Sequence, residues 1–312
     1  MKRAEGSVVE QSGVQAAAGI CFMVFGTMCF ASKSIFVKWV YEQGASPTAV
    51  LLYRQLIAAP LFWMICFLYR SKLPPKPQKR EIIQACTAGL LCFFLSPLLD
   101  FIGLHYVSAI VERMLLMSYP IFALILSALA KKKIMPMRDL IAILLVNVGL
   151  FLAVGGWDSQ LVKANLFGAC LIILSAVVYA AYLVVSGSLV HRIGGIRMNA
   201  YGMSAASVLM VGYTGVQAAG DEPVNLVSCD PSLYGLFVIM AVVTTVIPFM
   251  LMLEGIKRIG AERGAVISMA GPVITIFFGV LFLNEHLTAI QWAGCCLVLL
   301  VIGFLEYRKI KR

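Results

Sequence analysis

The chain has 312 residues, of which 61% are hydrophobic and only 13% are charged, and its formal net charge is +10. Soluble domains carry about 25% charged residues, so this composition excludes a water-facing globule built around one core. The basic residues occur in short clusters between apolar runs and form no basic face with interleaved aromatic residues. Nucleic acid is therefore not expected as a partner.

Ten apolar runs follow one another along the chain, each close to the roughly 20 residues that a helix needs to cross a bilayer. The runs are 16–38, 47–69, 82–104, 108–130, 137–155, 163–187, 196–219, 232–256, 261–283 and 287–306. Their hydrophobicity is continuous and does not alternate, which indicates helices and excludes a barrel. The sequence predicts an all-α membrane protein with ten transmembrane helices surrounded by membrane lipids.

The loops between these runs carry an asymmetric charge. If the N-terminus lies in the cytoplasm, 20 of the 25 Lys and Arg residues fall on the cytoplasmic side, including Lys131, Lys132 and Lys133. This asymmetry is the positive-inside pattern, and it also favours an even number of spans. We expect a multi-pass protein of the cell (cytoplasmic) membrane with both termini in the cytoplasm. The first run contains Lys33 and lacks a cleavage site, so it is interpreted as a retained span.

An internal repeat emerges when the chain is shifted by 152 positions. The stretch 99–120 then lies over 251–272 with five identities, among them Pro120 over Pro272 near the middle of the fourth and ninth runs. Two domains are predicted, 1–155 and 156–312, each with five helices. Five is an odd number, so the second half is expected to be inverted relative to the first, an architecture that recurs in transporters.

The second half contains a long block of small and apolar residues, Gly255–Phe304, in which Leu283-Asn284-Glu285 precedes the last span. Tyr106–Lys133 and Leu51–Pro60 correspond to it in the first half. With these motifs the chain resembles the drug/metabolite transporter superfamily, in its EamA-type ten-span branch. The resemblance implies a permease for amino acids, other small metabolites or drugs, without a nucleotide-binding domain and with an ion gradient or exchange as driving force. Lys131–Lys133 stand where relatives often have an acidic residue.

Five charged residues fall inside the apolar runs: Lys33, Arg54, Asp100, Glu112 and Arg113. A charge in a span costs about 2.5–3.5 kcal/mol on insertion scales and usually faces a cavity or a partner. We interpret the five as a polar substrate pathway or outer gate, with one excess positive charge that suits a carboxylate-bearing substrate. Two alternatives are a permanent pairing that only orients helices, such as Arg54 with Asp100, and snorkelling of Lys33 to the surface.

Three further hypotheses concern residues near the span centres. Asp100 or Glu112 is a candidate site for a coupling proton, although a carboxylate that never titrates is the simpler interpretation. Tyr119, Tyr179 and Tyr182 are candidates for lining a metabolite cavity, against positions that face lipid or core. Pro120 and Pro272 are candidate hinges because a proline within a helix removes a backbone donor, while the alternative is a kink without function.

A membrane enzyme acting on lipid or on a membrane-embedded substrate is the competing hypothesis, followed by a receptor or scaffold. The sequence has no HExxH, no GxSxG and no Walker motif, and its three histidines are scattered, so we expect no catalytic residues. The nine cysteines have no metal-binding spacing, and eight lie in apolar runs. No metal and no cofactor are expected. The sequence predicts a secondary transporter and leaves its substrate, direction, coupling ion and oligomeric state open.

Overall fold

The computed structural model describes residues 2–130, 137–154, 156, 159–219, 231–260, 264, 267–268 and 270–310. Over these residues the chain is helical, with turns and no strand, which confirms the all-α prediction. The α-helices are α1 (Lys2–Ala31), α2 (Lys33–Glu42), α3 (Pro47–Leu68), α4 (Lys79–Gly89), α5 (Ser96–Tyr106), α6 (Ala109–Leu116), α7 (Tyr119–Ala130), α8 (Met137–Val154), α9 (Ser159–Ile193), α10 (Gly195–Ala219), α11 (Pro231–Ala241), α12 (Ile247–Ile259), α14 (Gly271–Leu283) and α15 (Ala289–Ile310). Lys131–Lys133, which the orientation argument uses, lie outside the described residues.

Each predicted apolar run is largely helical over its described residues. Six helical stretches are long and apolar enough to cross a membrane: Gln15–Glu42, Pro47–Leu68, Lys79–Tyr106, Ala109–Ala130, Asn165–Gly187 and Leu233–Ile259. Leu144–Val154, Gly271–Leu283 and Ala289–Val301 are shorter apolar helices. The protein is therefore a multi-pass membrane protein, while the number of ten crossings stays a prediction.

Several runs that hydropathy predicts as single helices are interrupted. The first run breaks at Ser32 between α1 and α2, and the fourth run breaks at Met117 and Ser118 between α6 and α7. At the second break Ser118 turns its hydroxyl back onto the carbonyl of Leu115 at 2.7 Å. Hydropathy does not register these breaks because the residues at them are small or apolar. Backbone hydrogen bonds from Ser32 to Met28 and from Phe36 to Ser32 cross the first interruption, so α1 and α2 belong to one helical stretch, Gln15–Glu42.

Two spans contain a π-helical segment, and the two segments have equivalent positions in the halves. They are Leu90–Leu95 between α4 and α5 and Val242–Val246 between α11 and α12, which begin 152 residues apart. A proline follows each segment by two residues, at Pro97 and Pro248. A π-helical turn leaves a backbone group without its usual partner. In the first half Gln55 uses one of these groups, because its side-chain amide donates to the carbonyl of Phe93.

The two halves also repeat a close helix contact. A Cβ added to Gly168 of α9 would lie 2.7 Å from the carbonyl oxygen of Gly103 in α5. A Cβ added to Gly255 of α12 would lie 3.0 Å from the carbonyl oxygen of Gly19 in α1. Gly103 and Gly255 are 152 residues apart. Small residues allow helices in a membrane to pack with their backbones close together. The same type of glycine contact therefore joins α5 to α9 and α1 to α12.

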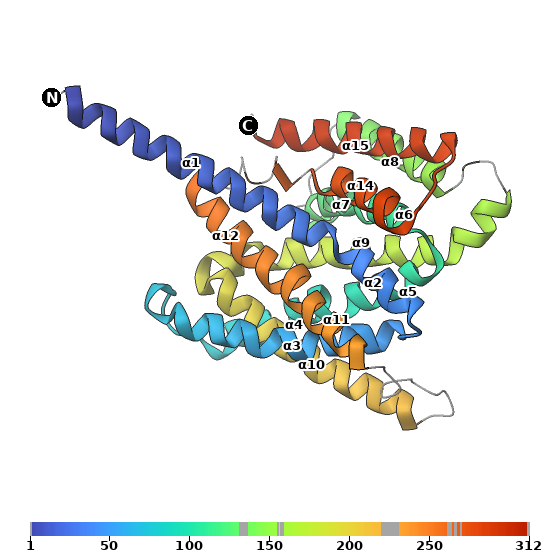
Figure 1. The fold of residues 1–312 in the computed structure, drawn as a ribbon, viewed down its shortest axis with the longest axis horizontal. Coiled ribbons are helices and arrows are strands. Elements are labelled where there is room, and N and C mark those ends of the chain that lie inside the picture. Colours follow the sequence, from blue (N-terminus) through green and yellow to red (C-terminus); the bar gives the residue numbers. More distant parts are fainter. Residues whose placement is uncertain are drawn as a thin grey trace.

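Helices from different halves pack against each other throughout the bundle. The contacts join α1 to α12, α3 to α10, α6 to α14 and α8 to α15. Figure 1 shows α8 and α15 side by side at one edge, and α6, α2 and α5 in the interior between the outer helices. In that view α1 begins and α15 ends on the left side of the molecule. The buried charges of the first half therefore lie where both halves meet.

Candidate functional site

Lys33 is the centre of the buried polar cluster. The break at Ser32 makes Lys33 the first residue of α2, which packs against α5 and α6. Its ammonium nitrogen Nζ lies 2.6 Å from Oδ2 of Asp100 and 3.0 Å from Oε1 of Glu112. Asp100 is 3% exposed and Glu112 is 0% exposed, so both ion pairs are shielded from solvent. One lysine thus holds two carboxylates from two different helices.

The two carboxylates differ in how many partners they have. Ser34 donates its hydroxyl to Oε2 of Glu112 at 2.6 Å, so both oxygens of Glu112 accept a hydrogen bond. Oδ1 of Asp100 is buried and has no partner. Asp100 is therefore the carboxylate with a free oxygen for another donor. Its role in proton coupling stays a prediction, as does that of Glu112.

Arg54 on α3 makes a different contact from the one considered in the sequence analysis. Its guanidinium carbon lies 4.8 Å from the centroid of the Phe101 ring, a cation–π distance, and the side chain is only 7% exposed. Its Nε has no hydrogen-bond partner, and the guanidinium makes no ion pair with any described residue. Arg54 makes no ion pair with Asp100 in this structure, and the ammonium of Lys33 is the hydrogen-bond partner of Asp100. Arg54 interacts with Asp100 only electrostatically, without a hydrogen bond.

Arg113 on α6 points toward the second half of the chain. It is 4% exposed, and its guanidinium carbon lies 5.3 Å from the ring centroid of Phe30 in α1. Its Nη2 lies 2.7 Å from the point that a Cβ on Gly271 would occupy, directly against the start of α14. Its Nε has no hydrogen-bond partner.

The three predicted tyrosines form one aromatic row. The ring centroids of Tyr119 and Tyr179 are 5.1 Å apart, and those of Tyr179 and Tyr182 are 5.7 Å apart. Tyr179, the middle ring, interacts electrostatically with Arg113, and Tyr182 at one end of the row lies close to Cys92. The structure thus brings these rings into one region with Arg113. All three are half-buried, and their role in lining a substrate cavity stays a prediction.

Pro120 and Pro272 occupy helix starts. Pro120 is the second residue of α7 and Pro272 is the second residue of α14, and these helices begin 152 residues apart. At the first turn of a helix proline costs little, because no intrahelical donor is lost there. The sequence analysis placed both prolines in the middle of continuous helices, and for the fourth run the structure shows a break at Met117–Ser118 instead. A hinge role for either proline stays a prediction.

The sequence analysis missed the role of Glu285, which follows α14. Its two carboxylate oxygens accept hydrogen bonds from the backbone N–H groups of Ala109 at 2.6 Å and Ile110 at 3.0 Å. These are the first two residues of α6, so an acidic side chain of the second half caps a helix of the first half. Asn284 has a left-handed backbone with φ of 51° and turns the chain toward this cap. An Asn-Glu pair after an apolar helix is a signal for such a turn.

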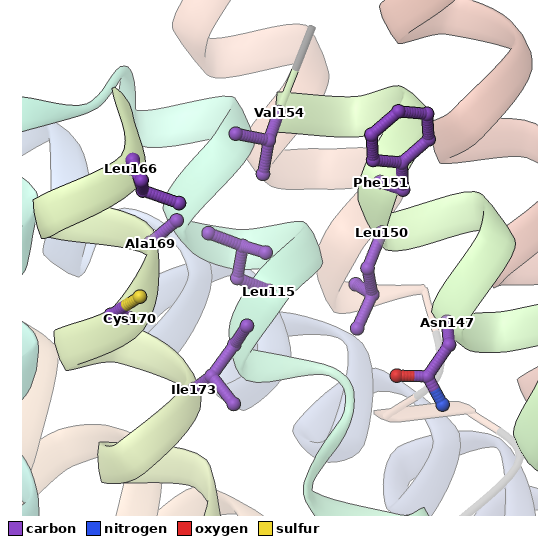
Figure 2. Close-up of a pocket in the computed structure, with 9 residues that line it drawn as sticks. All are labelled: Leu115, Asn147, Leu150, Phe151, Val154, Leu166, Ala169, Cys170 and Ile173. Atoms are coloured by element: carbon purple, nitrogen blue, oxygen red, sulfur yellow. The ribbon is translucent and has the colours of Figure 1, made fainter. Parts of the chain in front are cut away.

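A cavity among the described residues lies apart from this polar cluster. It has a volume of about 200 Å³ and is lined by Leu115 of α6 and by side chains of α8 and α9 (Figure 2). The lining is apolar apart from Asn147, and its Phe151 and Leu166 are about half exposed, as side chains that face lipid are. None of the predicted site residues lines it. We therefore place the candidate site at the buried charges and not at this cavity.

No group of three His, Cys, Asp or Glu residues that could hold a metal ion occurs in the part of the chain that the structure describes. The candidate site is therefore organised by ion pairs and unpaired guanidinium groups. Such a cluster can bind an anion, exchange ion-pair partners or bind a proton.

The profile of the EamA-like transporter family matches residues 17–155 and again residues 166–306. This chain belongs to the EamA-like transporter family. An uncharacterized transporter of Bacillus subtilis (strain 168), YcbK, is 58% identical to it over 303 residues, or 97% of each chain. A second relative, the uncharacterized transporter sll1319 of Synechocystis sp., is 27% identical over 95% of this chain and 92% of its own length.

One solved crystal structure resembles the fold of this family member. It aligns with a TM-score of 0.55 over 96% of this chain and 99% of its own, at 17% sequence identity. At this identity the likeness extends to the fold alone. The family repeat and the transporter relatives support a non-enzymatic membrane transporter, in agreement with the predicted class.

Proposed function

We propose that this protein is a secondary transporter that moves a small metabolite bearing a carboxylate group, such as an amino acid or organic acid, by alternating access. The observation that carries the proposal is the pair of buried arginines, Arg54 and Arg113, that lack hydrogen-bond partners beside a lysine that already binds two carboxylates. A desolvated guanidinium favours a planar carboxylate as its partner. Membrane lipid is the surrounding solvent, and no nucleic acid takes part.

The mechanism follows from the ion pairs at the junction of the halves. In alternating access the two halves, inverted relative to each other, rock around a binding site near the midplane. The contacts of Lys33 with Asp100 and Glu112 close one side of such a site, and the cap that Glu285 places on α6 ties the second half to the first. Both contacts have to break when that side opens. A coupling proton or ion would act at the Asp100–Glu112 pair.

Membrane orientation is part of the same proposal. The positive-inside charge pattern favours both termini in the cytoplasm, and the start of α1 and the end of α15 lie on the same side of the molecule in Figure 1. The relatives from bacterial cells support the cell membrane as the location.

Flux into proteoliposomes tests the proposal. Detergent-purified protein is first screened by thermal unfolding against amino acids, organic acids, amines and nucleosides, because a ligand of the native state raises stability. Stabilising solutes are then assayed for transport. Arg54→Ala should reduce flux at least tenfold while the folded yield falls much less, and Arg192→Ala, at an arginine whose side chain is 57% exposed, should change neither.

Two results would contradict the proposal. If Arg54→Ala lowers flux and folded yield equally, Arg54 has a structural role only. If the wild-type protein moves no solute down a gradient and instead modifies a lipid, the competing hypothesis of a membrane enzyme replaces transport.

A further inference from the structure

The buried charges of the site do not cancel, and the surplus can be located. Lys33 contacts both Asp100 and Glu112, and Arg54 interacts electrostatically with Asp100. These four side chains sum to zero. Lys38, Glu42 and Glu285 are not fully buried and interact with one another, so they lie outside this sum. The remaining positive charge belongs to Arg113, whose neighbour Glu112 already accepts from Lys33 and Ser34.

The surroundings of Arg113 add to its positive potential. Its Nη2 lies against Gly271, the first residue of α14, where the backbone dipole of that 13-residue helix is positive. No side chain caps this helix start, and Pro272 offers no N–H. A cation packed against the positive end of a helix is repelled by it, and the side chain is nevertheless 4% exposed with an unpartnered Nε. An anion held by the guanidinium beside this helix start would offset both unfavourable interactions.

The guanidinium of Arg113 can lie close to the start of α14 because Gly271 and Thr27 leave room for it. A Cβ on Gly271 would lie 2.7 Å from Nη2 of Arg113 and 3.5 Å from Cγ2 of Thr27 on α1. Thr275, one turn into α14, donates its hydroxyl to the carbonyls of Gly271 and Ala31, which holds α14 against α1. The absence of a side chain at residue 271 is therefore what lets the guanidinium reach the helix start.

We propose that Arg113 and the first turn of α14 form an anion subsite that takes the carboxylate group of the transported solute, separate from Arg54. The subsite is built from both halves of the chain, because α6 belongs to the first and α14 to the second. One monoanionic group neutralises the buried cluster, as a desolvated site requires. The inference rests on the proposed function and narrows it, because it assigns the carboxylate group to Arg113 and the first turn of α14.

Formate is the probe, because it is the smallest carboxylate and fits wherever a larger one does. Thermal unfolding of the full chain in detergent is measured in sodium formate against sodium gluconate at equal ionic strength. Formate should stabilise the wild type in a saturable way. Arg113→Gln should weaken the apparent affinity about tenfold or more, because a desolvated charge pair is lost. Arg192→Gln, at an arginine whose side chain is 57% exposed, is the control and should leave the effect unchanged.

Gly271→Ala is the second variant, and it leaves every charge in place. Its methyl group fills the space beside Nη2 and should weaken formate binding several-fold. Gly212→Ala on α10 is the matched control, because a Cβ there meets no atom within 4 Å, and it should bind formate like the wild type. If Arg113→Gln does not fold, Gly271→Ala still decides the question.

The inference is overturned if formate gives no saturable stabilisation of the wild type, if Arg113→Gln or Gly271→Ala binds it normally, or if Arg192→Gln loses as much affinity as Arg113→Gln. Its failure is distinguishable from that of the proposed function. Formate binding that depends on Arg113 in a protein without solute flux supports the subsite and contradicts the transporter. Carboxylate flux that is unaffected by Arg113→Gln supports the transporter and contradicts the subsite.

Discussion

The two halves of the protein share irregular features of their helices, and they differ in the charged side chains that they bury. Both halves have a π-helical segment in the third of their five predicted spans, and both begin a new helix in the fourth. The five buried charges, however, all belong to the first half. At the positions 152 residues later, Asp100 is matched by Met252, Glu112 by Gly264 and Tyr119 by Gly271.

This difference indicates which features serve the scaffold and which serve the solute. Breaks and close glycine contacts occur twice because both halves pack in the same way. On the proposed function, the charges occur once because one solute needs one set of ligands. The second half contributes space at Gly271 and the carboxylate of Glu285, which caps α6. The candidate site is therefore asymmetric although its scaffold is repeated.

The buried charges occur in the first half and make the two halves asymmetric. Among them, removing Lys33 should have the largest effect on folding stability. In Lys33→Met, Asp100 and Glu112 remain as two buried carboxylates without their cation, which should cost about 3–5 kcal/mol of folding stability. Folded yield and thermal unfolding in detergent measure this loss.

The triple variant Lys33→Met, Asp100→Asn, Glu112→Gln is the control for that experiment. With all three charges removed it should recover most of the stability but not the solute flux, because a neutral replacement of a buried ion pair is often tolerated. If Lys33→Met alone unfolds like the wild type, the buried triad is not what joins α2, α5 and α6.

The close glycine contacts occur in both halves, so substitutions at these glycines should destabilise the protein equally. In Gly103→Ala the new Cβ would lie 2.6 Å from Cγ1 of Ile172, and in Gly255→Ala it would lie 2.6 Å from Cγ of Met23. Each substitution should destabilise by about 1–3 kcal/mol through overpacking. Gly212→Ala, with open space around its Cβ, should be neutral or slightly stabilising. A loss at one glycine and none at the other would show that the halves do not share this contact.

Hydropathy predicted where the helices lie but not where they are interrupted. The sequence predicted the helical content and the helix Pro47–Leu68, because the length of an apolar run indicates a membrane helix. It also predicted the repeat offset of 152, because identical residues recur at that spacing. The interruptions at Ser32 and at Met117–Ser118 were not predicted, since an irregular turn within a membrane helix leaves no polar interval in the sequence. The inverted orientation of the second half stays a prediction.

The buried charges were found from the sequence, but their pairing was not. A charge inside an apolar run is visible without a structure, which is why Lys33, Asp100 and Glu112 were all candidates. The sequence analysis considered Arg54 as the partner of Asp100, and the geometry gives that position to Lys33 because the break at Ser32 turns α2 toward α5. The contact between Arg113 and Gly271 depends on packing between segments that are far apart in the sequence, and no local sequence pattern predicts such packing.

Accessibility of Cys92 to water tests the central claim most directly. Cys92 lies in the π-helical segment, interacts electrostatically with Arg54 and is half-buried, whereas Cys295 between α8 and α15 is buried. In a variant that retains only Cys92, a small anionic methanethiosulfonate reagent should label the folded protein in liposomes, and a transported carboxylate should slow the labelling. A variant that retains only Cys295 should stay unlabelled. Labelling of Cys92 only after denaturation would contradict a water-accessible pathway at these charges.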